Sequence, residues 1–191
     1  MLNAALDLRD EDFEIIEGEK IMSPSPHKVH MYIMSNLFFH LFLNLRDKNV
    51  RIFMDNMDIH LPDGNLVKPD LSIVCDPECL KRGATVYGVP DFVVEILSRS
   101  TMRRDLTVKK DIYEKNGVKE YWIINPWSKT VSVNILRDGK FFLDEVYSVY
   151  SEEDLAELTD EEKAAIKFDI QLSIFDNLKI NVNDIFYRIE D

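Results

Sequence analysis

The sequence predicts an α/β fold in which helices cover a mixed β-sheet. Three observations lead to this prediction. Apolar residues recur at helical spacing over Pro26–Arg46. The run Asp91–Leu97 is almost wholly apolar, as in a strand covered on both faces. A second helical pattern, Met102–Asn116, follows that run and leads into another apolar run, Glu120–Asn125. A strand, a helix and a strand in succession are typical of an α/β fold.

The N-terminal elements follow from local signals. Phe13–Ile21 predicts a short hairpin around Gly18. The helix over Pro26–Arg46 comes next. Val50–Leu61 is predicted as a strand, and it ends at the turn sequence Pro62-Asp63-Gly64-Asn65.

Turn and loop signals divide the rest of the chain. Leu66–Cys75 is predicted as a strand, and Asp76–Pro90 as a loop rich in glycine and proline. Asn116-Gly117 is a C-terminal signal for the second helix. Thr130–Leu136 and Phe141–Val149 are predicted to pair as a hairpin across Asp138-Gly139.

Length and composition are those of one globular domain. The chain has 191 residues, of which 46% are hydrophobic and 30% charged, enough for a hydrophobic core. We therefore predict a single domain over residues 1–191, with its core at about residues 13–136 and an acidic C-terminal extension over residues 150–191. Within this extension, Ser151–Lys167 has a helical composition and begins with an N-cap residue.

Membrane-spanning and disulfide-bonded classes are excluded. The longest apolar stretch, Leu37–Leu45, is too short to cross a bilayer and contains His40 and Asn44. Cys75 and Cys79 have no second pair of cysteines with which to form a zinc site or a disulfide framework. The sequence therefore predicts a cytoplasmic protein with reduced thiols.

Charge is unevenly distributed. The net charge of −12 opposes binding to a polyanion when the chain is taken as a whole. From Asp144 onwards there are fourteen acidic and four basic residues. The stretch Arg99–Lys119 is the exception, because it has seven basic and three acidic residues. Any contact with a nucleic acid is therefore expected around this stretch.

A lysine lies on the apolar side of the second predicted helix. That side is marked by Leu106, Val108, Ile112 and Tyr113. At about 100° per residue, Lys109 falls near its middle, with Asp105 one turn earlier, whereas Lys110 falls on the polar side. A lysine directed at a core is costly unless a partner is present. The alternative interpretation is that Lys109 has only a structural role, as the partner of Asp105 in an ion pair along the helix.

Two acidic residues upstream are the candidate partners of Lys109. Asp70 and Glu95 each lie inside an apolar run predicted as a strand, where an unpaired carboxylate is expensive. Carboxylate oxygens, together with water and phosphate oxygens, are the ligands that Mg²⁺ takes. Three ionisable groups directed at one interior point therefore indicate a metal-dependent hydrolytic site. The alternative for Asp70 is a residue at a strand end with no metal.

At these residues the chain resembles the PD-(D/E)XK nuclease superfamily through Pro69-Asp70 and Glu95-Ile96-Leu97. It resembles more closely the Uma family of restriction-endonuclease-like proteins, over roughly Phe13 to Leu136. The matching stretches are Met22-Ser-Pro-Ser-Pro26 followed by His30, Lys68-Pro-Asp-Leu71, Pro90-Asp-Phe-Val-Val-Glu-Ile-Leu-Ser98, Asp105 with Lys109 and Tyr113, and Gly117-Val-Lys-Glu-Tyr-Trp122. No single piece is specific, but the ordered set is.

The resemblance implies a restriction-endonuclease-like α/β fold, a mixed sheet flanked by helices with added β-hairpins. It implies that Asp70 and Glu95, helped by the backbone carbonyl of Ile96, bind Mg²⁺ or Mn²⁺. The usual lysine of the superfamily falls two residues after the second acid, where this chain has Leu97. Lys109 matches branches in which the lysine lies on the following helix.

Further residues are candidates for the edge of the site. His30 matches a family position, although it could also be a capping or surface residue, as could His27. Glu19 is a candidate for an additional acid near the metal. Asp105 belongs to the family pattern around Lys109.

The main functional hypothesis is a metal-dependent endonuclease that hydrolyses DNA phosphodiester bonds. Arg99, Arg103 and Arg104 would contact the DNA backbone. The alternative is a catalytically inactive member of the fold that acts as a binding or assembly module, favoured by the acidic net charge and by Leu97. A third hypothesis is a homodimer in which exposed aromatic residues near Trp127, Phe141 and Phe142 form the contact, and it can coexist with the nuclease hypothesis.

Overall fold

The computed structural model of the protein describes residues 13–22, 27–55, 57–81 and 83–189. The N-terminal hairpin is confirmed, with β1 (Phe13–Ile16) antiparallel to β2 (Glu19–Met22). Helix α1 (Lys28–Leu45) matches the predicted long helix. Its predicted start at Pro26 lies outside the described residues.

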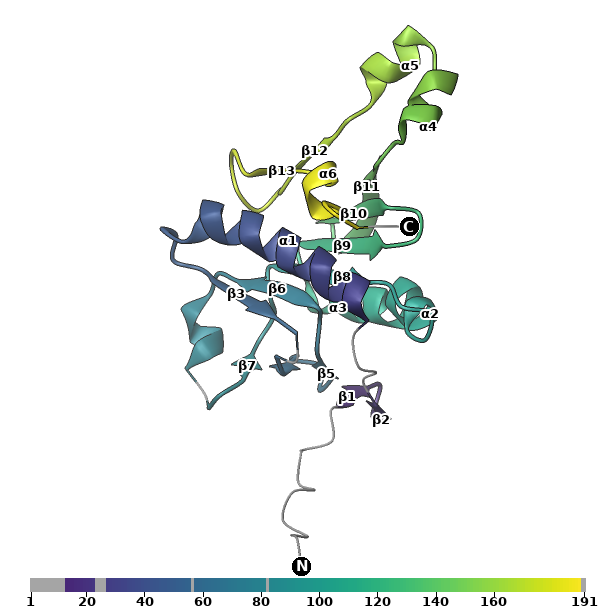
Figure 1. The fold of residues 1–191 in the computed structure, drawn as a ribbon. Coiled ribbons are helices and arrows are strands. Elements are labelled where there is room, and N and C mark those ends of the chain that lie inside the picture. The colour runs from purple at the N-terminus through teal and green to yellow at the C-terminus, as the bar shows by residue number, and fades with distance from the viewer. Residues whose placement is uncertain (1–12, 23–26, 56, 82, 190–191) are drawn as a thin grey trace, which may run out of the picture.

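A six-stranded mixed sheet forms the centre of the fold (Figure 1). Its spatial order is β11-β10-β9-β8-β6-β3, in which β8 and β9 are parallel and the other neighbours are antiparallel. The strands are β3 (Arg51–Met54), β6 (Leu71–Val74), β8 (Phe92–Ile96), β9 (Glu120–Asn125), β10 (Thr130–Arg137) and β11 (Lys140–Ser148). The mixed α/β fold is therefore as predicted.

A second sheet, of order β2-β1-β5-β4-β7, includes the N-terminal hairpin. Its other strands are β4 (Ile59–His60), β5 (Leu66–Val67) and β7 (Val86–Tyr87). The predicted strands Val50–Leu61 and Leu66–Cys75 are therefore wrong as continuous elements, because each divides between the two sheets. In the second of them Pro69, which has no N–H to donate to a ladder, lies between β5 and β6.

The connection between β8 and β9 holds the second helical segment. It consists of α2 (Met102–Arg104), a π-helical turn (Asp105–Lys109) and α3 (Lys110–Asn116). Gly117 ends it with a φ of 88°, which confirms the predicted stop. The loop predicted over Asp76–Pro90 contains a 3₁₀ helix, Pro77–Leu80, in addition to β7.

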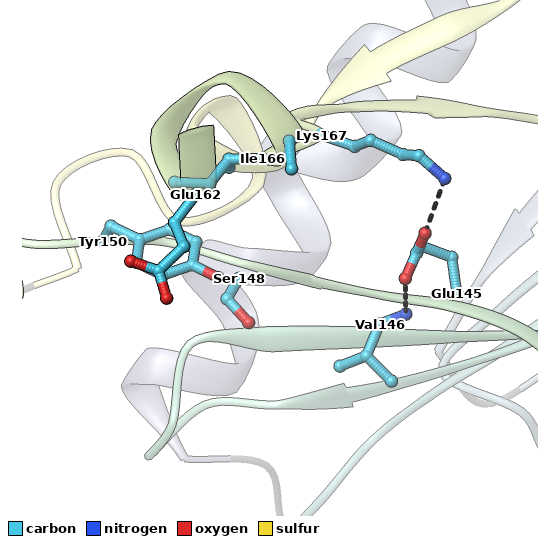
Figure 2. A pocket seen from close by; sticks show the side chains of 8 residues that line it. Glu145, Val146, Ser148, Tyr150, Glu162, Ile166 and Lys167 are labelled. Atoms are coloured by element: carbon cyan, nitrogen blue, oxygen red, sulfur yellow. Dashed lines mark hydrogen bonds and ion pairs between the residues drawn. The ribbon is translucent and has the colours of Figure 1, made fainter. Parts of the chain in front are cut away.

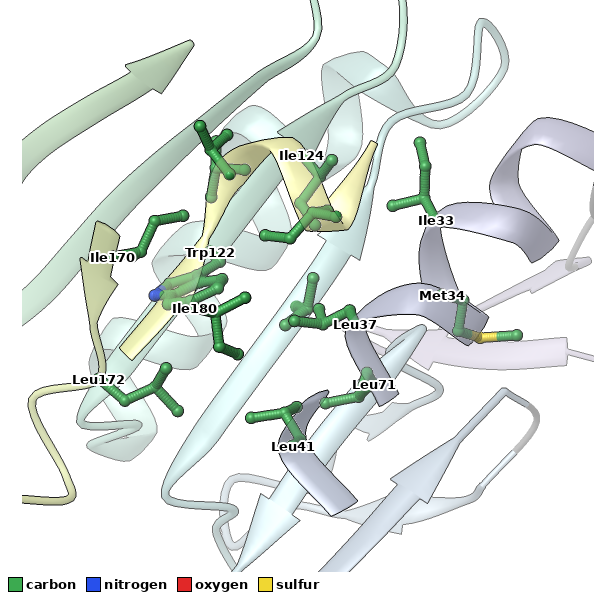
Figure 3. Close-up of a cluster of buried hydrophobic side chains, with 14 of the residues drawn as sticks. Ile33, Met34, Leu37, Leu41, Leu71, Trp122, Ile124, Ile170, Leu172 and Ile180 are labelled. Atoms are coloured by element: carbon green, nitrogen blue, oxygen red, sulfur yellow. The ribbon is translucent and has the colours of Figure 1, made fainter. Parts of the chain in front are cut away.

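Two apolar cores lie on the opposite faces of the six-stranded sheet. On one face α1 packs in a cluster with alternate residues of β8, namely Phe92, Val94 and Ile96. Figure 3 shows Leu37 and Leu41 of α1 beside Leu71 of β6 in this cluster. On the other face, Val93 packs in a cluster with Ile112 and Tyr113 of α3. This two-sided burial explains why the β8 sequence is almost continuously apolar.

The C-terminal part also contributes to the first core. Helices α4 (Glu152–Glu157) and α5 (Asp160–Ala165) bury no side chain, and Figure 1 shows them at the far end of β11. The chain then returns to pack beside α1 as β12 (Asp169–Gln171), β13 (Lys179–Asn181) and α6 (Val182–Ile185). The sequence had assigned these residues to the acidic extension.

A buried carboxylate on β9 holds the C-terminal segment against the central sheet. Glu120 of β9 accepts hydrogen bonds from Trp122 Nε1 at 2.6 Å, from the Ser173 amide at 2.7 Å and from Ser173 Oγ at 2.6 Å. Both of its oxygens are thereby used, and burial raises the pKa of its carboxyl group. The contact joins the central sheet to the segment that leads into β13.

In the described part of the chain, no helix is long and apolar enough to cross a membrane. Cys75 and Cys79 are free thiols. Burial and the neighbouring Asp91 raise the pKa of the Cys75 thiol to about 11, so it is a poor nucleophile at neutral pH.

We expect Leu37→Ala to lower the free energy of unfolding by about 2–5 kcal/mol, because Leu37 is completely buried between α1 and the sheet. The matched control is Leu43→Ala on the same helix, since Leu43 is 47% exposed and should change stability by less than about 0.5 kcal/mol. Urea denaturation of both variants measures the difference, and equal losses would contradict this assignment of the core.

Candidate active site

Charged side chains are buried where the N-terminal hairpin, β8 and the helical segment 102–116 meet. The side chains of Glu14, Glu95, Asp105 and Lys109 are each at most 4% exposed. Burial of four charged groups in one place is unusual for a protein interior. We call these residues, together with Asp70, His30 and Arg104, the charged cluster.

Lys109 lies at the centre of the charged cluster. Its Nζ is 2.8 Å from Glu95 Oε1 and 2.8 Å from Glu14 Oε1. The two carboxylates raise the pKa of Lys109 above its ordinary value, although burial alone would lower it. The predicted inward direction of Lys109 is confirmed, and Lys110 is less buried, as expected. The Lys109 ammonium is therefore held by Glu95 and Glu14, and not by a simple ion pair with Asp105.

The helical segment departs from the regular geometry on which that prediction depended. Asp105–Lys109 forms a π-helical turn, which has a wider repeat than an α-helix. Asp105 and Lys109 are both buried by this turn, whereas Leu106 is 44% exposed. The prediction that Leu106 faces the core is therefore wrong. π-Helical turns are frequent at functional sites.

Glu95 comes from the middle of the central sheet. It lies on the same face of β8 as Val93, as the strand alternation predicted, and its Oε1 also accepts a hydrogen bond from the Tyr113 hydroxyl at 2.7 Å. Burial raises the pKa of Glu95 well above its ordinary value. Lys109 opposes this shift, and the charges of Asp105, Asp70 and Glu14 add to it.

Asp70 precedes β6 rather than lying inside a strand, so the prediction that it is part of a strand is wrong. The chain changes sheets at this point, directly after Pro69. Asp70 Oδ2 accepts the Ile96 amide N–H at 2.6 Å. Ile96 thus contacts Asp70 through its backbone amide, whereas the atom expected to help bind the metal is its backbone carbonyl. The side chain of Asp70 is 17% exposed, which makes it one of the more accessible carboxylates of the charged cluster.

His30 lies beside Asp70, as the family pattern suggested. It is in the first turn of α1, and its Nε2 is 2.9 Å from Asp70 Oδ1. Burial lowers the pKa of His30, but the hydrogen bond to Asp70 and the nearby acidic charges raise it by more, so its net pKa is above the ordinary value. His27 is exposed at the N-cap and makes no side-chain capping bond.

Glu14 is the site residue that the sequence reasoning missed. Its Oε1 accepts the Lys68 amide N–H at 2.9 Å, and its Oε2 is 3.4 Å from Arg104 Nη2. Glu19, the acid suggested from this hairpin, is exposed on β2. The available signal was strand alternation, because Glu14 shares a face of β1 with the buried Ile16.

The arginines separate into two kinds. Arg99 and Arg103 are exposed, as expected for contacts with a nucleic acid. Arg104 instead turns toward Glu14, and its buried Nε has no hydrogen-bond partner among the described residues. The same is true of Asp105 Oδ1, and burial raises the pKa of this carboxyl group. Both atoms retain the capacity to bind a further group.

A pocket elsewhere does not contain this chemistry. It lies between β11 and α5 (Figure 2) and is lined by residues that include Tyr150, Glu162 and the Lys167–Glu145 ion pair. None of the charged cluster contributes to it. The candidate site is the charged cluster, because the buried ionisable groups gather there.

A comparison with protein families identifies the chain. The Uma2 family model, described as "Putative restriction endonuclease", matches residues 2–170. The chain belongs to the Uma2 family. No curated protein matches the sequence. This membership confirms the resemblance that the sequence indicated.

The Uma2 fold also has a solved relative. The structure is similar to the crystal structure of a protein described as a putative nuclease belonging to DUF820, from Anabaena variabilis ATCC 29413. The TM-score is 0.64 at 20% sequence identity, and the match covers 92% of this chain and 90% of that chain. At this identity the likeness supports the fold, which is restriction-endonuclease-like as expected.

The donor chemistry fits a divalent cation, although among the described residues no group of three or more His, Cys, Asp or Glu side chains is placed to hold a metal ion. Mg²⁺ is often bound by only one or two carboxylates with waters. Burial raises the pKa of Glu95, and the charges of Asp105, Asp70 and Glu14 add to this shift against the opposing effect of Lys109, while Asp105 Oδ1 has no hydrogen-bond partner in the described part of the chain. A cation would offset the negative charge of these carboxylates.

We expect the His30–Asp70 pair to make stability depend on pH. A histidine with a raised folded-state pKa stabilises the fold below its unfolded pKa of about 6.5 and ceases to do so as pH rises through the folded value. The loss of unfolding free energy in His30→Gln should therefore be largest below pH 6.5 and smaller at pH 8.5. Urea denaturation in EDTA measures it. His27→Gln is the control, and a loss that grows with pH would contradict the pairing.

Proposed function

We propose that this Uma2 protein is a metal-dependent endonuclease that hydrolyses phosphodiester bonds of DNA. The observation that carries the proposal is the buried contact of 2.8 Å between Lys109 Nζ and Glu95 Oε1, beside Asp70. These are the acidic and basic residue types that a metal-assisted phosphodiester hydrolysis needs. Their positions agree with the family pattern.

Asp70 and Glu95 would hold Mg²⁺ or Mn²⁺, with the backbone carbonyl of Ile96 as a further oxygen ligand. The hydrogen bond from the Ile96 amide to Asp70 already joins the two acidic segments. Such an ion lowers the pKa of a bound water and neutralises charge on a phosphodiester. The four carboxylates gathered there, Glu14, Asp70, Glu95 and Asp105, and the unpartnered Oδ1 of Asp105 among the described residues support this assignment.

Lys109 would orient the attacking water or bind the scissile phosphate. The Tyr113 hydroxyl would hold Glu95 in place, because it donates to the same oxygen that Lys109 contacts. Leu97, at the usual lysine position, is 5% exposed and packs in the core on the α3 side of the sheet. Since Lys109 reaches Glu95 from the π-helical turn Asp105–Lys109, the departure at Leu97 is compatible with an active enzyme.

DNA would approach at the basic stretch after β8. Arg99 and Arg103 are exposed there and would bind backbone phosphates. Arg104 is less exposed and faces Glu14, so it would act on the DNA backbone through its positive charge. These residues lie in the segment that follows Glu95 and Ile96 and that has an excess of basic residues, so the local charge would favour DNA in spite of the net charge of −12.

The enzyme would act in the cytoplasm and as a homodimer that cuts both strands. Trp127 and Phe142 are 50% and 52% exposed, and Tyr32 and Phe39 on the outer face of α1 are 58% and 57% exposed. A second copy of the chain would cover such apolar surface. Sedimentation velocity would test this part of the proposal, with a single monomeric species as the contrary result.

We expect Lys109→Met to reduce nicking of supercoiled DNA in Mg²⁺ by about 10²-fold or more, because one donor at the reacting phosphate is lost. Asp70→Ala and Glu95→Gln should reduce it at least as strongly. Rates of nicking under single-turnover conditions are the measurement.

Lys110→Met is the matched control, because it removes the neighbouring positive charge from the less buried side of the helix. It should remain within about twofold of the wild-type rate. Equal rates for all variants would contradict the site. A wild-type protein that binds DNA but never cuts it, in either Mg²⁺ or Mn²⁺, would favour the binding-module alternative.

A further inference from the structure

Glu14 makes contacts that metal binding by Asp70 and Glu95 does not require. It reaches the charged cluster from the N-terminal hairpin, far from those acids in sequence, and its side chain is 3% exposed. One oxygen contacts the Lys109 ammonium and the Lys68 amide, and the other faces Arg104. A single carboxylate thus joins two of the cationic groups on which the proposed reaction depends.

Glu14 provides a second anion for Lys109 at a site where a metal ion would compete with it for Glu95. Lys109 and a metal ion would both be attracted to Glu95, and two cations that share one carboxylate repel each other. Once a metal ion neutralises Glu95, the buried ammonium needs another anion, or it loses its proton or its position. Glu14 supplies that anion at 2.8 Å, on a separate element of the fold.

We propose that Glu14 is a positioning residue that keeps the Lys109 ammonium beside the site when Glu95 is neutralised by a metal ion. The Lys68 N–H, two residues before Asp70, fixes the Glu14 carboxylate relative to the metal-binding segment. Arg104 is held on the second oxygen of the same carboxylate. This inference rests on the proposed function, because it assigns Lys109 a role that depends on metal at Glu95.

A metal-free experiment isolates the role of Glu14. Glu95→Gln mimics a neutralised Glu95, and lysine-labelled protein reports the Lys109 ammonium as a slowly exchanging ¹H–¹⁵N signal, assigned by its absence in Lys109→Arg. We expect the signal to persist in Glu95→Gln and to be lost in the Glu14→Gln/Glu95→Gln double variant. Glu17→Gln in the Glu95→Gln background is the control, because Glu17 is exposed at the turn of the same hairpin.

Loss of the signal in Glu95→Gln alone would overturn the inference, and so would its persistence in the double variant. Glu14→Asp in the Glu95→Gln background covers the case in which the double variant does not fold. It keeps the charge but withdraws the carboxylate by one methylene, so the signal should weaken through faster exchange. An unchanged signal there would also count against the role of Glu14.

Kinetics separate a positioning role from a structural one. Glu14→Gln should lower kcat for DNA cleavage by about 10²-fold with an unchanged KM, since a small displacement of Lys109 affects the reacting step. Glu14→Asp should recover part of this loss. If the wild-type protein cuts no DNA, the proposed nuclease function fails while the ammonium spectra still decide the role of Glu14. If it cuts DNA and Glu14→Gln matches it, only the inference about Glu14 fails.

Discussion

The ammonium of Lys109 lies 2.8 Å from an oxygen of Glu95 and 2.8 Å from an oxygen of Glu14. Because a buried ammonium is stable only when carboxylates accompany it, these two contacts constrain three elements at once. The hairpin must dock where Glu14 reaches Lys109, β8 must present Glu95 on the same face of the sheet, and the π-helical turn must direct Lys109 inward. Displacement of any one element would leave a charge unpaired in the interior.

Burial of this many ionisable groups costs stability, and the fold compensates for it on both sides of the central sheet. The α1 face and the α3 face each hold a separate apolar core, and the charged cluster adjoins the second of them. Groups with strongly shifted pKa values gather at functional sites more often than elsewhere. In this protein they gather around Glu95, whose carboxyl group has several acidic neighbours and one buried lysine.

Residues governed by local periodicity were predictable from the sequence. The burial of Lys109 and the facing of Glu95 follow from helical and strand alternation, which are properties of a few consecutive residues. The exposure of Leu106 could not be predicted in this way, because a π-helical turn changes the angular spacing of side chains and leaves no clear mark in the sequence. Asp70 was misplaced because an apolar run on both sides of Pro69 conceals a change of sheet.

Residues governed by long-range packing were not predictable. Glu14 could be identified as a charged residue on an apolar strand face, but nothing local says against which helix the hairpin docks. The returning C-terminal strands were hidden by their acidic surroundings, although Ile170 and Ile180 are almost fully buried beside α1. Such contacts depend on the whole chain, so a single sequence carries little signal for them.

The parallel pairing of β8 and β9 has a consequence for the order in which the protein assembles. Glu95, Lys109 and Tyr113 all belong to one continuous strand–helix–strand stretch, so their contacts close short loops and can form early in folding. Glu14 leaves the ribosome first but has to wait for that stretch to be synthesised before it can contact Lys109. We therefore expect the hairpin to dock only after that stretch has formed, and this docking brings Glu14 into the charged cluster.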